Sequence, residues 1–340
     1  MKAEWVGTSS WIYRTQFYSR SLSHHSKATL ALDGLDTFAV VHLDGKLILR
    51  SDNMFVSHRV DVTEALKSQR EHRLEIEFDS ALLRARQLKK CYPRHKWTCF
   101  NGESARLAAR KAQYHWGWDW GPLLNCAGIW KPIRLEVYMA KIDELRTDIV
   151  VAQDRKSATV KVSTKIETNN NDSLRANFKI SFQGEMVAQT SSLVELEGIA
   201  SASFRIDSPF LWMPAGYGSQ SLYDVQVTLF SQNAELHSES CRIGLRHVEL
   251  VQEPDSHGQS FYFRINGVDI FCGGSCWIPA DSFLTNITPH RYRAWIALVV
   301  QANQTMIRYV VSLLYFSTKC SLAQGVGRRH LRRRRLLLRL

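Results

Sequence analysis

The sequence predicts a mainly β protein with two β-sandwiches, the second immunoglobulin-like, followed by the first strand–helix–strand portion of an incomplete (β/α)8 barrel. Three observations support this fold class. Short strand-like runs separated by turn signals fill residues 11–138. About six further short runs fill residues 142–248, which is the strand density of an immunoglobulin-like sandwich. Beyond residue 261 a strand, a helix and a second strand follow one another, as at the start of a parallel barrel.

The first sandwich is indicated by alternating apolar residues and by turn dipeptides. Residues 27–32 and 73–78 alternate with period two, as half-buried strands do. Asp33-Gly34 and Asp44-Gly45 are pairs that accept positive φ, so each predicts a tight hairpin connection. Residues 61–66 predict one short helical turn.

A polar, basic stretch at residues 80–111 interrupts the strand pattern. Its composition favours helix, and long insertions in compact domains are often functional. We therefore expect an excursion that leaves the sandwich. Arg110 and Lys111 lie at its end, and we expect them on an exposed, solvated face rather than in contact with a substrate.

The barrel start is predicted from helix signals that follow a glycine-rich strand. Thr288 is a suitable N-cap, and Pro289 suits the first helical position. A helix over residues 292–302 then leads into the apolar residues 305–309. The expected domains are a sandwich at 1–141, an immunoglobulin-like sandwich at 142–248, a barrel start at 249–308 and a basic tail at 309–340.

The net charge argues against a nucleic-acid-binding body. The chain has 44 Lys and Arg against 32 Asp and Glu, a formal charge of +12. Residues 319–340 hold one Lys, seven Arg and no acid, which is 8 of those 12 charges. A basic domain spreads its charge over a folded face, so we expect neither a nucleic-acid partner nor, for the body, an acidic one.

No targeting or membrane segment is evident in the sequence. The first 17 residues lack the apolar run of a secretory signal, and polar residues interrupt the apolar stretch at 294–316. The seven Cys are irregularly spaced, without a nearby His at Cys272 and Cys276 to complete a zinc site. We expect reduced thiols, a cytoplasmic protein, no membrane partner, no metal and no cofactor.

A tryptophan-rich motif at residues 113–122 is the densest chemical feature. Three of the ten Trp fall within five residues around Asp119. Aromatic faces stack on the apolar surface of a sugar ring, while a carboxylate accepts hydrogen bonds from sugar hydroxyls. Buried Trp rings can equally form a hydrophobic plug between domains, and composition alone does not decide between the two.

This motif resembles the end of the sugar-binding domain of β-mannosidases in glycoside hydrolase family 2. The resemblance continues in order through residues 128–136, 209–218, 222–225, 263–267 and 273–283, and covers about residues 5–308. It implies a jelly-roll-like galactose-binding sandwich at the amino terminus. It also implies a retaining hydrolase that removes terminal β-linked mannose from non-reducing ends, with two carboxylates about 5–5.5 Å apart.

The resemblance places both catalytic carboxylates on later barrel strands, as glutamates. No Glu follows Glu253, so no residue of this chain matches either of them. We expect a β-mannosidase fragment that is inactive alone, with a β-mannoside or manno-oligosaccharide as substrate. The alternative is a non-catalytic carbohydrate-binding protein, and the sequence leaves a homodimer open.

Five residues of this chain match the support around the family's active site. The resemblance implies that Asp119 and Trp118 contact mannose hydroxyls. Trp277 and Asp281 follow the first barrel strand, where loops form the active face, although packing or capping would also account for them. Arg308 ends the second barrel strand and suits a role in holding a carboxylate nucleophile.

The sequence departs from the family in three places. We expect the first sandwich to lack an edge strand, because relatives begin before residue 4. Cys276 occupies a position where the family often has a polar residue. The glycine-rich continuation expected after Arg308 is absent, and residues 309–340 end in an Arg- and Leu-rich tail. We interpret this tail as a mistranslated or mis-spliced end, with a nuclear-targeting tail or a divergent terminus as the alternatives.

Overall fold

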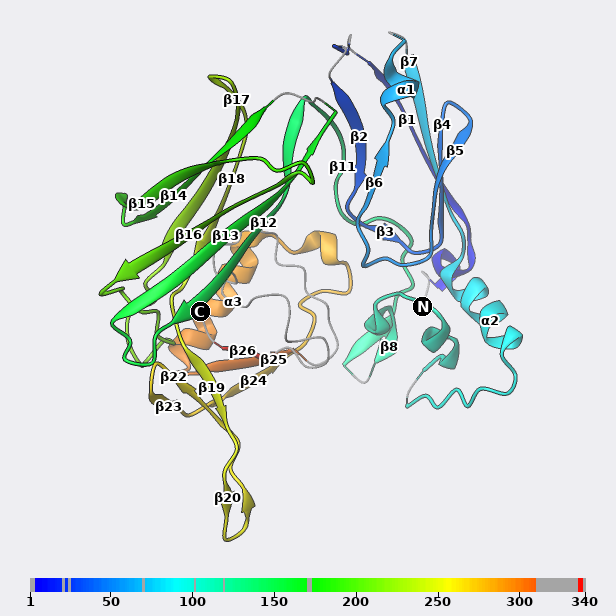
Figure 1. Cartoon of the computed structure of the whole chain (residues 1–340). Coiled ribbons are helices and arrows are strands. Elements are labelled where there is room, and N and C mark those ends of the chain that lie inside the picture. Colours follow the sequence, from blue (N-terminus) through cyan, green and yellow to red (C-terminus); the bar gives the residue numbers. More distant parts are fainter. Residues whose placement is uncertain are drawn as a thin grey trace. The chain divides into compact units, whose positions relative to one another are not determined.

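A computed structural model describes residues 4–19, 22–23, 26–68, 71–100, 102–118, 120–169, 173–309 and 336–338. Strands dominate, and the mainly β fold class is confirmed (Figure 1). The chain forms two compact units. The first contains Met1–Tyr138 and Ile278–Thr288, and the second contains Met139–Trp277 and Pro289–Val310.

The first unit is a sandwich of a four-stranded and a three-stranded sheet. The larger sheet has the order β1 (Trp11–Tyr18), β7 (Glu71–Phe78), β4 (Ala39–Leu43) and β5 (Lys46–Ser51). The smaller has the order β11 (Ile133–Tyr138), β2 (Lys27–Leu32) and β6 (His58–Asp61). Alternate residues of β7 are buried, and they join the apolar residues of β2 and β4 in one core.

The two Asp-Gly pairs behave differently. Asp44 and Gly45 have φ of 52° and 79° and join β4 to β5, which confirms the predicted hairpin. The hairpin prediction for Asp33-Gly34 is wrong, because neither residue has positive φ and β2 pairs with β11 and β6 instead. Gly34 is needed for another reason. A Cβ there would lie 2.5 Å from Nε1 of Trp130.

The predicted excursion at residues 80–111 contains α2 (Ala81–Cys91) and η2 (Ser104–Ala108). The tryptophan-rich motif follows it, in η3 (Gln113–His115), β8 (Trp116–Trp118) and β9 (Gly121–Leu123). The first unit also has the short elements η1 (Glu4–Thr8), α1 (Thr63–Leu66), β3 (Leu35–Asp36) and β10 (Gly128–Ile129). Ser80 caps α2 by accepting a hydrogen bond from the amide of Leu83 at 3.1 Å. The short turn predicted at residues 61–66 is confirmed as α1.

The second unit begins with a seven-stranded, immunoglobulin-like sandwich. One sheet has the order β12 (Ala140–Val151), β13 (Ser157–Thr168) and β16 (Ile199–Asp207). The other has the order β15 (Glu185–Leu193), β14 (Leu174–Phe182), β17 (Tyr223–Ser231) and β18 (Ala234–Ile243). Alternate residues of β13, β14, β16 and β17 point inward and form a single apolar core.

The rest of the second unit contains short sheets and one long helix. An antiparallel sheet has the order β19 (Val248–Val251), β22 (Tyr262–Ile265) and β23 (Val268–Ile270). A separate hairpin of β20 (Pro254–Asp255) and β21 (Gly258–Gln259) lies between β19 and β22 in sequence. β24 (Gly274–Trp277) pairs in parallel with β25 (Met306–Tyr309), and α3 (Pro289–Gln301) lies between them in the chain. The predicted strand–helix–strand unit is therefore present, and its place in a full barrel stays a prediction.

The carboxyl-terminal tail is almost entirely outside the described residues. Only β26 (Leu336–Leu338) is described, and it pairs with β25. The interpretation of residues 309–340 as a mistranslated end therefore stays a prediction. Within the described part of the chain, no helix has the length and apolar character needed to span a membrane. The six cysteines that the structure describes are all free thiols.

Candidate functional site

A short hairpin in the first unit presents the tryptophan-rich motif. β8 pairs with β9, so that Trp116 lies opposite Leu123 and Trp118 lies opposite Gly121. Asp119 falls between β8 and β9 in sequence and lies outside the described residues. Its predicted contact with a sugar stays a prediction. The two neighbouring tryptophans can be placed, and they differ sharply from Trp116.

Trp116 anchors the hairpin in the fold. It is fully buried and packs with Leu82 and Ala85 of α2 and with Ala105 of η2. Large buried aromatic area of this kind is a strong packing contribution. The helical excursion therefore supplies the platform that carries the hairpin, and Trp116 belongs to the core of the first unit. The predicted hydrophobic plug between domains stays a prediction.

Trp118 and Trp120 keep part of their surface open. Trp120 is 37% exposed and Trp118 is partly buried, and their ring centroids are 6.5 Å apart. The guanidinium of Arg106 lies 4.7 Å from the centroid of the Trp118 ring, and Arg106 itself is buried. This cation–π contact fixes the orientation of the Trp118 indole. The hairpin thus offers two ordered aromatic rings on a rigid base.

A buried ion pair lies under the hairpin. The ammonium of Lys111 is 2.5 Å from Oδ2 of Asp36, and both side chains are at most 2% exposed. Lys111 also donates to the carbonyl of Cys126 at 2.7 Å. Asp36 lies in β3 beside β10, so the pair joins that small sheet to the segment before the hairpin. The expected solvated face is correct for Arg110, which is exposed, and wrong for Lys111.

His115 continues this network toward a distant segment of the same unit. Its Nε2 donates to the carbonyl of Ser282 at 3.0 Å, and its Nδ1 lies 3.8 Å from Oδ2 of Asp36. His115 is buried and directly precedes Trp116. The hydrogen bond therefore ties the base of the tryptophan hairpin to the segment that carries Asp281.

The charge states follow from burial and from Lys111. Burial alone would raise the pKa of Asp36, but the nearby Lys111 and His115 and the hydrogen bonds from Lys111 and Thr37 hold it below its usual value. Burial and the Lys111 charge lower the pKa of His115 to about 4. Burial raises the pKa of the Cys126 thiol to about 12. At neutral pH the site holds one carboxylate, one ammonium, a neutral imidazole and a thiol.

The network of Asp36, His115 and Cys126 has the side chains of a metal site, but the Lys111 ammonium already binds its carboxylate. The ligand-type atoms of Asp36, His115 and Cys126 lie within 4.8 Å of one another. Metal ions bind the thiolate form of cysteine, whereas Cys126 keeps its proton and donates to Asp36 at 3.4 Å. The Lys111 ammonium already supplies the positive charge that the carboxylate needs. We therefore interpret the network as a structural support for the hairpin.

The other predicted site residues have local contacts. Trp277 is buried, and its ring centroid lies 5.8 Å from Trp295 and 6.3 Å from Tyr292 of α3. Oδ1 of Asp281 accepts a hydrogen bond from the amide of Phe283 at 2.9 Å. Arg308 is exposed on β25, opposite Cys276. The predicted roles of Trp277 and Asp281 as pocket residues, and of Arg308 in holding a carboxylate nucleophile, stay predictions.

The supporting residues were not predicted from the sequence. Asp36 lies in a two-residue strand, and Lys111 follows other basic residues in a stretch that looks solvated. Only His115 carried a signal, because it opens the tryptophan-rich motif. Ion pairs between residues 75 positions apart leave no local pattern.

Comparison with known protein families places both sandwiches in one group. Residues 1–131 match the galactose-binding-like domain of glycosyl hydrolase family 2, and residues 140–246 match the model of glycosyl hydrolases family 2. β-Mannosidase B from Emericella nidulans is 53% identical over 310 residues, which are 91% of this chain and 36% of that protein. β-Mannosidase B from Aspergillus oryzae is 52% identical over 309 residues, with the same coverage.

Solved structures agree with these sequence matches. The β-D-mannosidase of Dictyoglomus thermophilum superposes with a TM-score of 0.80 at 32% identity, covering 90% of this chain and 38% of that one. A β-glycosidase from Bacteroides vulgatus, at 19% identity and a TM-score of 0.61, shares the fold over 88% of this chain and 33% of its own. The chain thus spans about a third of the length of the relatives it matches. The chain belongs to glycoside hydrolase family 2, and it carries the two β-sandwich domains found toward the amino terminus of that family's β-mannosidases.

Proposed function

We propose that this chain contributes the two sandwich domains of a β-mannosidase, which hydrolyses terminal β-linked mannose with retention of configuration. The supporting observation is the identity of 50% or more to several proteins named β-mannosidase B, over 91% of this chain. In such an enzyme two carboxylates act as nucleophile and acid/base. No Glu follows Glu253, so we propose that the chain alone has negligible activity.

Within this proposal, the tryptophan hairpin contributes to sugar recognition. Trp118 and Trp120 are partly open, Arg106 orients one of them, and the buried network below holds their base. Asp119, between Trp118 and Trp120 in sequence, would accept hydrogen bonds from mannose hydroxyls. The proposed partner is a neutral β-mannoside. A cytoplasmic location stays a prediction from the sequence, and the oligomeric state stays open.

A chimera tests this function. The 310 residues that match Emericella nidulans β-mannosidase B would replace the corresponding part of that enzyme. We expect the chimera to hydrolyse 4-nitrophenyl β-mannoside, and Asp119→Asn to lower its kcat/KM about 10- to 100-fold, since one charge-assisted hydrogen bond contributes about 1.5–3 kcal/mol. Asp148→Asn, an exposed carboxylate on β12, is the matched control and should leave the rate unchanged.

Two results would contradict the proposal. One is a folded chimera that prefers 4-nitrophenyl β-glucoside or β-galactoside to the mannoside. The other is turnover by the purified 340-residue chain at a rate near that of the relative. The partly open aromatic rings also favour the second candidate, a non-catalytic carbohydrate-binding protein. That candidate requires mannobiose binding to the chain that disappears in Asp119→Ala.

A further inference from the structure

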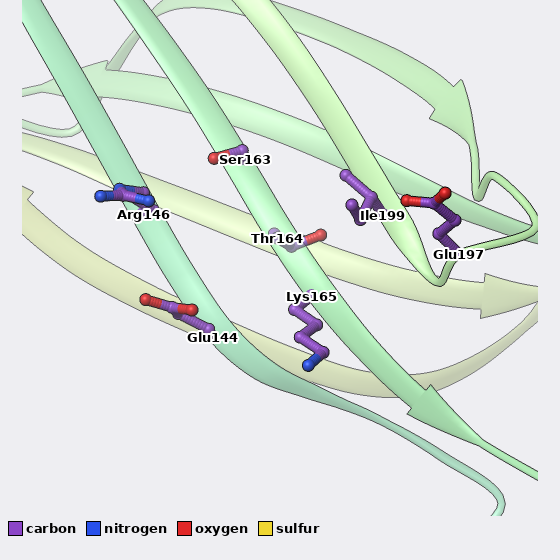
Figure 2. Close-up of a pocket in the computed structure, with 7 residues that line it drawn as sticks. All are labelled: Glu144, Arg146, Ser163, Thr164, Lys165, Glu197 and Ile199. Carbon is purple, nitrogen blue, oxygen red and sulfur yellow. The ribbon is translucent and has the colours of Figure 1, made fainter.

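A hollow lies on the three-stranded sheet of the immunoglobulin-like sandwich. It has a volume of about 360 Å³ and is formed by β12, β13 and the start of β16 (Figure 2). Ligand pockets in proteins have volumes of about 300–1,000 Å³. None of the five residues that the sequence predicted as site residues lines it. The hollow is therefore a separate feature from the tryptophan hairpin.

Strand register and a β-bulge assemble the walls of the hollow. Glu144 lies opposite Lys165, which in turn lies opposite Ile199, and Arg146 lies opposite Ser163. The register of β12 shifts between Ile142 and Glu144. Bulges redirect side chains and occur often beside functional sites. Here the bulge comes immediately before the first of the charged residues that line the hollow.

Four charged side chains surround the hollow without pairing. Glu144, Glu197, Arg146 and Lys165 all line it, yet within the described part of the chain none of them forms an ion pair or a side-chain hydrogen bond. Opposite charges on facing strand positions usually attract each other. Thr164 is also among the lining residues, but side chains alternate along a strand, and its buried hydroxyl lies on the core-facing side of β13, opposite to the side of Ser163 and Lys165.

The lining chemistry selects a neutral ligand that both donates and accepts hydrogen bonds. The two carboxylates only accept, the guanidinium and ammonium only donate, and the Ser163 hydroxyl does both. The four charges sum to zero, so a strongly charged ligand gains little from the hollow. Sugar hydroxyls both donate and accept hydrogen bonds, so a sugar ring suits this mixture of groups.

We propose that this hollow is a second saccharide-binding site, which takes a neutral sugar unit. The expectation that the sugar is mannose rests on the proposed function, whereas the saccharide class rests on the lining residues alone. Such a site would bind a sugar unit with residues of the second unit alone. Its binding is independent of Asp119.

Calorimetric titration of the 340-residue chain with mannobiose tests the proposal. We expect weak binding that Glu144→Gln and Lys165→Met each reduce at least about tenfold, because each removes a charge-assisted hydrogen bond. Lys161→Met is the matched control, since Lys161 is exposed on the same strand outside the hollow. Asp119→Ala should also leave this binding unchanged. The exposed positions of Glu144 and Lys165 allow both variants to fold, which circular dichroism checks.

Several outcomes would overturn the site. Binding that is lost in Asp119→Ala and kept in Glu144→Gln assigns the saccharide to the tryptophan hairpin. If a folded chain binds none of mannobiose, cellobiose and lactose, the proposal is wrong. If the chain binds glycine more tightly than any of these sugars, the ligand of the hollow is a zwitterion and not a saccharide. If cellobiose binds in the hollow and mannobiose does not, the saccharide site stands and the mannose assignment falls. Failure of the chimera to cleave mannosides rejects the proposed function alone.

Discussion

Replacing Lys111 with methionine should lower the free energy of unfolding by about 3–5 kcal/mol. Asp36 is 2% exposed, and its carboxylate has the Lys111 ammonium 2.5 Å away. Removing one partner of a buried ion pair leaves a charge without compensation, which typically costs about this much. Urea denaturation followed by tryptophan fluorescence measures the change, because Trp116 is buried a few residues away.

Two further variants separate the charge effect from lost packing. Asp36→Asn combined with Lys111→Met removes both charges, and it should recover most of the stability because no buried charge is then left unpaired. Lys161→Met, on the exposed face of β13, should change stability by less than about 0.5 kcal/mol. A loss below about 1 kcal/mol for Lys111→Met would show that the pair does not support the fold.

The stability of the chain should also fall as the pH drops from about 6.5 to about 4. His115 has a pKa of about 4 when folded, against an ordinary value of 6.5. In this window the unfolded chain binds the proton and the folded chain does not, so acidification favours unfolding. A difference of this size corresponds to about 3 kcal/mol. Below pH 4, Asp36 adds a further loss, because its pKa is lowered in the folded state.

Urea midpoints measured from pH 7 to pH 4 check this expectation. His115→Gln keeps a side-chain donor for the carbonyl of Ser282 and removes the titrating group. It should flatten the pH dependence between 6.5 and 4 while leaving the loss below pH 4 in place. An unchanged slope in this variant would assign the effect to other histidines, of which His58 also has a lowered pKa through burial.

Local sequence patterns predicted the elements of this fold well, and distant contacts were the part they missed. Asp44-Gly45 forms the expected turn because both residues take positive φ and are the two residues that join the paired strands β4 and β5. Asp33-Gly34 has the same residue pair, but neither residue takes positive φ, and the Trp130 ring packs against Gly34. A dipeptide contains no information on a side chain that lies about 100 residues away in sequence and packs against it.

The candidate site shows the same division. The tryptophan motif was found because its residues are adjacent in sequence, and its resemblance to the family covers both sandwiches. Lys111 was expected in solvent because its neighbours are basic and polar. Its burial is set by Asp36, which lies 75 positions earlier and which no spacing rule connects to it. Ion pairs between residues far apart in sequence could therefore be found only in the structure.

The hydrogen bond between His115 and Ser282 has a consequence for the order of folding. It joins residues 167 positions apart, and residues 278–288 belong to the first unit although the strands of the immunoglobulin-like sandwich lie between them in sequence. During synthesis from the amino terminus, that sandwich is complete by residue 243, before Ser282 is made. The first unit begins before the immunoglobulin-like sandwich but is finished after it, and its tryptophan hairpin gains its full support only when the segment that carries Ser282 has been made.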